Sequence, residues 1–142
     1  MAGLYMDPKA ELAKQFLMRA DDDLRLSELI VSESEPVYWA AAFHAQQCAE
    51  KALKSLLTFH DIRAGKTHDI GGLLKLSLPM LPGLEELNER AGTLTGYAVD
   101  SRYPGPYSEV TEKEAIEAIA AARAIYEFVL KSLPDLERLP QQ

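Results

Sequence analysis

The feature that most constrains the fold is a run of small residues at helical spacing between residues 36 and 60. These residues are Ala41, Ala42, Ala45, Cys48, Ala49 and Ala52, and the same run continues into Leu53, Leu56 and Leu57. Small side chains three and four residues apart allow a neighbouring helix to approach closely. The segment is therefore predicted to be the central helix of a helical bundle. Pro36 can begin this helix, because proline is tolerated in the first helical turn.

The segments on either side have the patterns of further helices. Asp7 as the N-cap and Pro8 at the first helical position begin a helix that is expected to end near Val31. Its predicted apolar stripe consists of Leu12, Phe16, Ala20 and Leu24. The residues "IGGLLKL" predict a short third helix, and an amphipathic fourth helix is expected from Gly83 onward.

The last helix begins with a capping box, because Thr111 is followed three positions later by Glu114. Its predicted core stripe is Ile116, Ile119, Ala122, Tyr126, Val129 and Leu133. No segment of the sequence alternates apolar and polar residues as a half-buried strand does. The prediction is an all-α fold, an up-and-down bundle of four main helices plus a short extra helix. Residues 1–142 are predicted to form a single domain, with its core from about residue 8 to residue 133.

Composition bears on location and on partners. The chain has 142 residues, of which 47% are apolar, and a net charge of -7. This is enough for one compact core, and it argues against a broad basic surface for unspecific binding of nucleic acid or membranes. The single cysteine, Cys48, cannot form a disulfide within the chain, and no signal segment or apolar run of about eighteen residues is visible. We expect a cytoplasmic protein that does not contact membranes.

Two sequence features resemble a phosphate-binding loop and a zinc site, but the neighbouring residues do not fit either kind of site. The "GKT" at residues 65–67 is similar to the end of a phosphate-binding loop, but that loop needs a glycine where this chain has His60. The three histidines, His44, His60 and His68, lack the spacing and the companion ligands of a zinc site. We therefore expect no metal ion and no cofactor.

One face of the predicted central helix carries polar side chains at intervals of three, four and three residues. They are His44, Gln47, Lys51 and Lys54, and we call them the polar stripe. One interpretation is a solvated helix face. The other is an anion-binding wall for a phosphate or a nucleotide, to which basic residues of the next loop would add. Those loop residues are Arg63, Lys66 and His68.

Three blocks of sequence occur in order along the chain. They are "FHAQQCAEKALKSLL" (43–57), "KTHDIGGLL" (66–74) and "YAVDSRYPG" (97–105). Together they resemble the signature of HEPN domains, with the usual separations. The resemblance implies a helical bundle that is usually a homodimer. Prokaryotic members commonly occur beside a minimal nucleotidyltransferase in toxin–antitoxin-type modules; many members are, or are suspected to be, metal-independent ribonucleases, and others are thought only to bind nucleotides.

The ribonuclease branch of the family has an arginine that is followed, after four to six residues, by a histidine near the start of the final helix. The matching arginine in "SRYPGPYSEV" (101–110) would be Arg102, but Tyr107 occupies the first histidine position, and no histidine follows. A phenol, with an ordinary pKa near 10, is a poor general base at neutral pH. The resemblance thus gives Arg102 and Tyr107 as candidate catalytic residues and leaves open whether the protein is an enzyme.

Each of these residues also has a structural interpretation. Arg102 can hold a phosphate through its planar guanidinium, or it can form an ion pair with a nearby acid. The acids considered are Asp100, Glu50 and Glu109. Tyr103 and Tyr107 can stack on a base or pack at an interface. His68, which belongs to the "KTHDI" block, is expected to cap or brace the third helix.

These observations lead to one functional expectation and two alternatives. We expect a HEPN-domain protein that binds nucleotide or RNA phosphate in a cleft of a helical homodimer, as a component of a nucleotidyltransferase-linked toxin–antitoxin-type module. The expected ligand-binding residues are His44, Gln47, Lys51, Lys54, Arg102 and Tyr103. The alternatives are a metal-independent endoribonuclease toxin with a nonstandard catalytic set, and a non-catalytic partner-binding or dimerisation domain.

Overall fold

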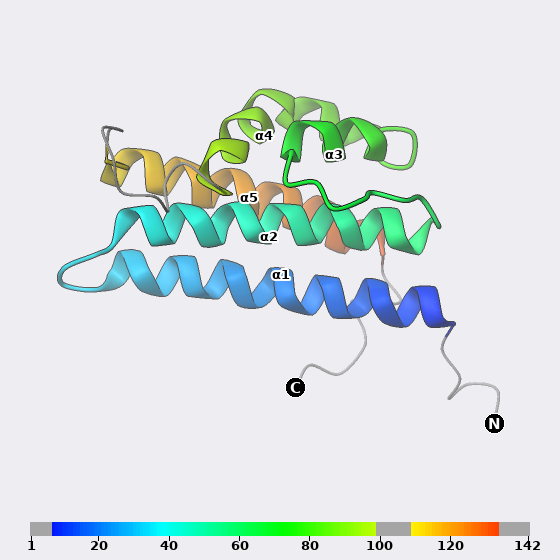
Figure 1. Cartoon of the computed structure of the whole chain (residues 1–142), viewed down its shortest axis with the longest axis horizontal. Helices are drawn as coiled ribbons and strands as arrows, with labels where there is room; N and C mark the ends of the chain where they lie inside the picture. Colours follow the sequence, from blue (N-terminus) through cyan, green and yellow to red (C-terminus); the bar gives the residue numbers. More distant parts are fainter. Residues whose placement is uncertain (1–6, 99–108, 134–142) are drawn as a thin grey trace.

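The computed structural model describes residues 7–98 and 109–133, and all regular structure in them is helical (Figure 1). The long helices are α1 (Pro8–Ser32), α2 (Tyr38–Phe59) and α5 (Glu112–Ser132). Between α2 and α5 lie the α-helices α3 (Ile70–Ser77) and α4 (Asn88–Leu94) and the 3-10 helices η2 (Pro82–Leu87) and η3 (Thr95–Ala98). The all-α prediction is confirmed.

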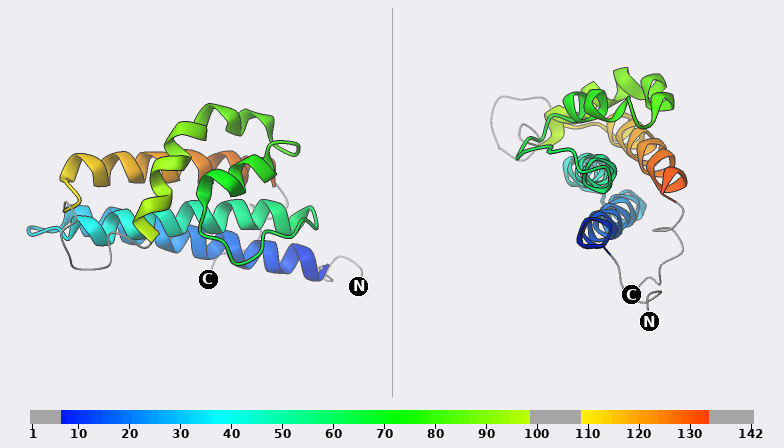
Figure 2. Two further views of the ribbon diagram at one scale, coloured as in Figure 1. Left: turned by 45° about the horizontal axis from the view of Figure 1, so that its top comes forward. Right: turned by 90° about the vertical axis from the view of Figure 1, so that its right-hand side faces the viewer.

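The chain direction alternates through the bundle. α1 and α2 are antiparallel, whereas α5 begins at the same end as α2 and runs beside it in the same direction (Figure 1). The Tyr38 hydroxyl donates a 2.9 Å hydrogen bond to the Glu112 carboxylate, which joins the starts of these two helices. After α3, the run η2–α4–η3 carries the chain back to the end of the bundle where α2 and α5 begin (Figure 1). α3 is the short extra helix. Figure 2 shows α3 and this run as a cover over α2 and α5.

α2 is the central helix, as its small residues predict. It packs against α1, α5 and α3. All six of its predicted small contact residues have an exposed fraction of 0%: Ala41, Ala42, Ala45, Cys48, Ala49 and Ala52. Because these side chains are short, the backbones of α1 and α5 can lie close to α2 on both sides. None of the described helices is long and apolar enough to cross a bilayer.

Two residues that were predicted to lie in the core are exposed. Leu12 has an exposed fraction of 48%, and Ile116 one of 53%. The buried stripe of α1 contains Ala13 and Leu17 in the place of Leu12 and Phe16, and α5 buries Ala115 and Ala118 beside Ile119. The predicted stripes followed the largest apolar side chains, but close helix packing selects the small ones.

The first and the last helix begin at the predicted residues, but only one of the two N-cap side chains makes a capping hydrogen bond. The Thr111 hydroxyl accepts a 3.1 Å hydrogen bond from the Glu114 N–H, and the Glu114 carboxylate accepts a 2.9 Å bond from the Thr111 N–H. This confirms the predicted capping box. Asp7 is the N-cap residue of α1 and Pro8 is its first residue, as predicted, although the Asp7 side chain makes no capping hydrogen bond.

The fourth predicted helix is divided into two kinds of helix. Its first part, η2, is a 3-10 turn, and α4 follows directly. Gly83 in η2 lies against the ring of Phe128 on α5, where an added Cβ would be only 2.8 Å from a ring carbon. A larger residue at this position would force the Phe128 ring or the turn to move, so the close approach of this turn to α5 favours glycine.

Candidate functional site

The polar stripe of α2 lies beside two buried carboxylates. Asp23 of α1 has an exposed fraction of 7%, and Glu50 of α2 one of 5%. Each carboxylate contacts one lysine and one histidine. We call Asp23, His44 and Lys51 the Asp23 centre, and we call Glu50, Lys54 and His68 the Glu50 centre.

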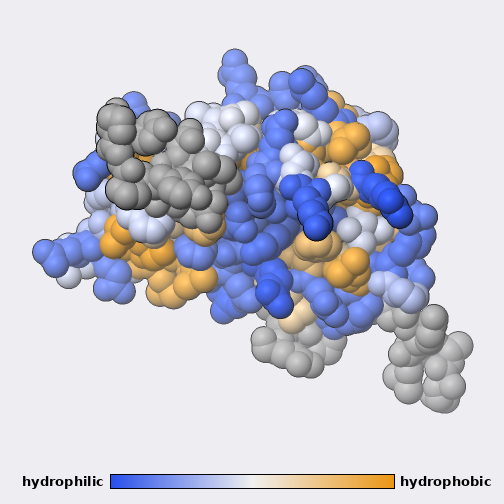
Figure 3. Space-filling model, viewed as in Figure 1, coloured by the Kyte–Doolittle hydropathy of each residue, from blue (hydrophilic) through white to orange (hydrophobic). Residues whose placement is uncertain are grey.

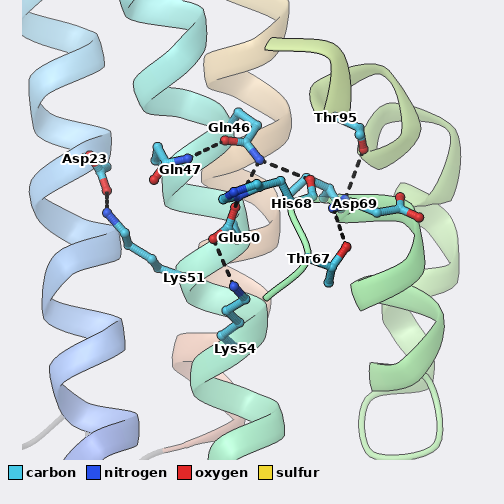
Figure 4. Close-up of polar contacts among 11 residues, drawn as sticks. Asp23, Gln46, Gln47, Glu50, Lys51, Lys54, Thr67, His68, Asp69 and Thr95 are labelled. Carbon is cyan, nitrogen blue, oxygen red and sulfur yellow. Dashed lines mark hydrogen bonds and ion pairs between the residues drawn. The ribbon is translucent and has the colours of Figure 1, made fainter. Parts of the chain in front are cut away.

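The Asp23 centre joins α1 to α2. The two oxygens of Asp23 are used separately: His44 Nδ1 lies 2.9 Å from Oδ1, and Lys51 Nζ donates to Oδ2 at 2.6 Å. His44 and Lys51 are two helical turns apart on α2, so both face the same position of α1. Figure 4 shows the contact between Lys51 and Asp23. The two side chains are 29% and 26% exposed, so they are half-buried.

The Glu50 centre joins α2 to the connection that precedes α3. His68 Nδ1 lies 2.7 Å from Glu50 Oε1, and Lys54 Nζ donates to Oε2 at 3.1 Å (Figure 4). The fully buried Gln46 donates to the same Oε1 and to the backbone oxygen of His68, both at 3.3 Å. The prediction that His68 braces α3 agrees with these contacts, because they fix the chain just before that helix begins.

The partners of Glu50 also decide its ionisation. Burial alone would raise the pKa of Glu50, because a charged carboxylate is poorly solvated inside a protein. The hydrogen bonds from His68 and Lys54 outweigh burial, and the pKa lies below its ordinary value. Glu50 is therefore a carboxylate at neutral pH.

Hydrogen bonds also fix the chain next to His68. The Asp69 carboxylate accepts from the Gly72 N–H at 3.1 Å and caps α3. The Ile70 N–H donates to the Thr95 hydroxyl at 3.0 Å, which ties this point to η3 (Figure 4). The side chain of His68 is thus set by Glu50, and its backbone by the first turn of α3.

The two lysines and His44 are partly buried and paired with carboxylates, so the polar stripe is not a freely solvated helix face. The interpretation that the stripe binds an anion stays a prediction. Gln47 donates to the side-chain oxygen of Gln46 at 2.7 Å and so extends the Glu50 centre. Arg63 and Lys66, by contrast, are exposed. Neither forms an ion pair with another residue in the described ranges.

The arrangement has two chemical capacities. Each lysine ammonium has three N–H groups, of which the carboxylate contact uses one, so the others can donate to an anion. Each imidazole has Nδ1 directed at a carboxylate, which leaves Nε2 for proton exchange. Residues 7–98 and 109–133 contain no group of three or more His, Cys, Asp or Glu residues that could hold a metal ion.

Sequence reasoning missed Asp23 and Gln46 and treated Glu50 only as an acid near Arg102. A signal for Asp23 exists in its spacing, because it lies three residues after Ala20 and four before Ser27, both buried. Three predicted residues, Arg102, Tyr103 and Tyr107, lie outside the described residues, as does Asp100. The roles proposed for them stay predictions.

Comparisons with known proteins agree with this architecture. The model of the HEPN domain family matches residues 13–133. A Methanocaldococcus jannaschii protein named "Putative toxin MJ1304" is 27% identical over 151 aligned residues, which cover 91% of this chain and 93% of that protein.

Two solved structures also match. The crystal structure of TT1696 from Thermus thermophilus is 33% identical, with a TM-score of 0.76, over 85% of this chain and 98% of that one. The crystal structure of ST0689, described as an archaeal HEPN homologue, is 31% identical, with a TM-score of 0.68, over 85% and 97% of the two chains.

Proposed function

Since the chain belongs to the HEPN domain family, we propose that it binds nucleotide or RNA phosphate in a cleft of a helical homodimer, as the toxin-type component of a module with a nucleotidyltransferase. The name of the M. jannaschii relative supports the toxin role. The observation that carries the binding proposal is the pair of buried carboxylates, Asp23 and Glu50, which hold Lys51 and Lys54 in fixed directions on α2.

Pre-organisation is the physical argument for phosphate binding. A flexible lysine loses side-chain freedom when it binds a phosphate, and this loss weakens the complex. Lys51 and Lys54 are already ordered by their carboxylates, so less freedom remains to be lost. The carboxylates also cancel part of the positive charge, so a second source of charge is needed. In our proposal Arg102 supplies it through a bidentate contact, and Tyr103 stacks on a base.

The first test is a titration of the protein with nucleotides and with short RNA, followed by calorimetry. We expect saturable binding that Arg102→Ala weakens by about 1.5–3 kcal/mol, as for a charged hydrogen bond. Lys113→Ala is the matched control, because it removes one positive charge from α5 at a side chain that is 85% exposed and is not part of the stripe. Absence of binding, or equal binding by the wild type and Arg102→Ala, would remove the basis of the proposal.

One observation favours a second candidate, a metal-independent endoribonuclease. His44 and His68 each present Nδ1 to a buried carboxylate, which is how acid–base enzymes fix the tautomer and the direction of an imidazole. Under this alternative one imidazole accepts the proton of the attacking 2′-hydroxyl, and a second group, the other imidazole or Tyr107, protonates the leaving oxygen. Arg102 stabilises the negative charge that develops on the phosphoryl oxygens.

The ribonuclease alternative is tested with single histidine variants in a cleavage assay that contains a chelator. We expect His44→Gln or His68→Gln to lower the cleavage rate by about 10²-fold or more, as loss of general acid–base catalysis does. His60→Gln is the control, since His60 is exposed and lies beside Phe59 at the end of α2. No cleavage by clean wild-type protein, together with no growth arrest on expression, would exclude this candidate.

A third candidate is a non-catalytic partner-binding or dimerisation domain. Large apolar side chains are exposed near the turn between α1 and α2, namely Leu26, Leu29, Val37 and Trp39. Figure 3 shows apolar surface over this end of the molecule. Partner binding that survives the combined removal of charge at Arg102, Lys51 and Lys54 would favour this candidate over the first.

A further inference from the structure

A pocket of about 400 Å³ lies between the first turns of α1 and the connection that follows α2. Its volume is in the range of pockets that bind small molecules, roughly 300–1,000 Å³. From its lining we infer that it binds a small molecule with an apolar body and one oxyanion group, a carboxylate or a phosphate. Of the two centres described above, only Lys54 also lines this pocket. The inference therefore shares one residue with the proposed phosphate site of α2, and its variants are placed at Arg63 and Asp61, which are not part of that site.

The charged groups of the pocket are the reason why we expect its ligand to carry an oxyanion group. Lys9, Lys54 and Arg63 line it together with one acid, Asp61. Lys9 Nζ and Asp61 Oδ2 are 3.9 Å apart, and the two side chains are 47% and 78% exposed, so their pairing is weak. Arg63 forms no ion pair within the described ranges. Its planar guanidinium matches a carboxylate or phosphate with two parallel hydrogen bonds.

The apolar side chains of the pocket are the reason why we expect the rest of the ligand to be apolar. Leu12, Phe16 and Ile62 line it, and most of its exposed lining is apolar. Leu12 is 48% exposed, so much of its side chain is available to a ligand. Covering such side chains removes apolar surface from water, and this favours binding. A bare inorganic anion would leave that surface wet.

The connection after α2 holds these groups in place. The Ile62 N–H donates to the Leu57 oxygen at 2.8 Å, and the Asp61 N–H donates to the Thr58 oxygen at 3.0 Å. These two bonds form a Schellman motif, in which the residue with positive φ is usually glycine. Here that residue is Asp61, with φ 59°. An acid therefore occupies a backbone position that favours glycine, and it does so at the pocket, beside Lys9 and Arg63.

The ligand chemistry is tested with four small probes, measured by calorimetry and by NMR titration of the whole chain. The probes are 3-phenylpropionate, phenyl phosphate, acetate and 3-phenylpropan-1-ol. We expect at least one of the two aromatic anions to bind with Kd below about 1 mM and at least about tenfold more tightly than acetate or the alcohol. Comparison of the carboxylate with the phosphate identifies the preferred oxyanion.

Variants test whether the binding is at this pocket. Arg63→Gln is expected to weaken binding of the preferred anion about tenfold. Lys66→Gln leaves it unchanged, because Lys66 belongs to the same connection but does not line the pocket. Asp61→Asn keeps a residue that tolerates positive φ and removes the negative charge, so it is expected to tighten anion binding about threefold and to leave the alcohol unaffected.

Three results would overturn the inference. The first is that neither aromatic anion binds saturably. The second is that Arg63→Gln and Lys66→Gln weaken binding equally, which would indicate only a general effect of charge. The third is that Asp61→Asn weakens anion binding while the NMR spectrum of the free variant shows an intact fold.

Discussion

The Asp23 and Glu50 centres contain the same three groups and differ in what holds them. In the Asp23 centre both partners of the carboxylate, His44 and Lys51, come from α2, and the carboxylate comes from α1. In the Glu50 centre the carboxylate and the lysine share α2, and the histidine comes from the connection before α3. The first centre therefore binds two packed helices together. The second binds a non-helical segment to the central helix, and its stability depends on that segment.

The centres also differ in solvation. The side chain of His68 is 56% exposed, whereas that of His44 is 29% exposed. For the lysines the Glu50 centre is instead the less exposed one, since Lys54 is 13% exposed and Lys51 of the Asp23 centre is 26% exposed. The Glu50 centre thus combines the more buried ion pair with the more accessible imidazole. We therefore expect the Glu50 centre both to contribute more to stability than the Asp23 centre and to present its imidazole more openly to solvent.

The largest effect is expected from Glu50→Ala. This change leaves Lys54 buried without its partner and removes an acceptor of the buried Gln46. Loss of one member of a buried ion pair costs about 3–5 kcal/mol. The free energy of unfolding, measured with urea, should fall by that amount, whereas Glu127→Ala, an exposed position of α5, should change it by less than about 0.5 kcal/mol. A loss of less than about 1 kcal/mol would contradict the description of the Glu50 centre as a buried network.

Asp23→Ala is expected to have the second largest effect. It also breaks a pair with a buried carboxylate, but Lys51 and His44 are exposed enough to regain water. We expect a loss of about 2–3 kcal/mol in the same urea experiment, below that for Glu50. Asp22→Ala is the control, since Asp22 is exposed and contacts only Arg25 among the described residues. If the order of Asp23 and Glu50 were reversed, the comparison of the two centres would be wrong.

The dependence of stability on pH tests the Glu50 centre by itself. The pKa of Glu50 is lowered in the folded state, so its contribution to stability is fully present above the unfolded pKa, near 4.5, and is lost as the pH falls through the folded value. The difference in unfolding free energy between the wild type and Glu50→Gln should therefore shrink below about pH 4.5. Urea unfolding of both proteins between neutral and acidic pH measures it. A difference that grows on acidification would contradict the sign of the pKa shift.

The smallest effect is expected from Thr95→Val. The change keeps the shape of the side chain and removes the hydroxyl that accepts from the Ile70 N–H. We expect a loss of about 1 kcal/mol and faster amide exchange just before α3. The NMR signals of the His68 ring should shift, and those of the His44 ring should not. Equal shifts in both rings would mean that the centres are coupled rather than separate.

The sequence contains enough information for the fold and for part of the site. Small residues at spacing three and four are sufficient to identify α2 as the central helix, and Thr111 with Glu114 locates the start of α5. The polar stripe correctly brings Lys51 and Lys54 to one face. Its carboxylate partners are harder to find, because the spacing of Asp23 points to burial only once the buried face of α1 is known.

Asp23 illustrates this limit. It is the last of three consecutive aspartates and the only buried one of the three. Which of the three is buried depends on the rotation of α1 about its axis, and the predicted stripe through Leu12 and Phe16 gave a different rotation from the observed one through Ala13 and Leu17. His68 depends on a further event, the folding of the α2–α3 connection back onto α2, which no local pattern encodes.

The most direct test of this account is NMR observation of the imidazole nitrogens during titration with a short RNA. We predict that His44 and His68 carry a proton on Nδ1 at neutral pH and that their Nε2 signals shift as RNA is added, while His60 does not respond. If both rings instead carried their proton only on Nε2, or if RNA left both unchanged, the Asp23 and Glu50 centres would not be the site that we propose.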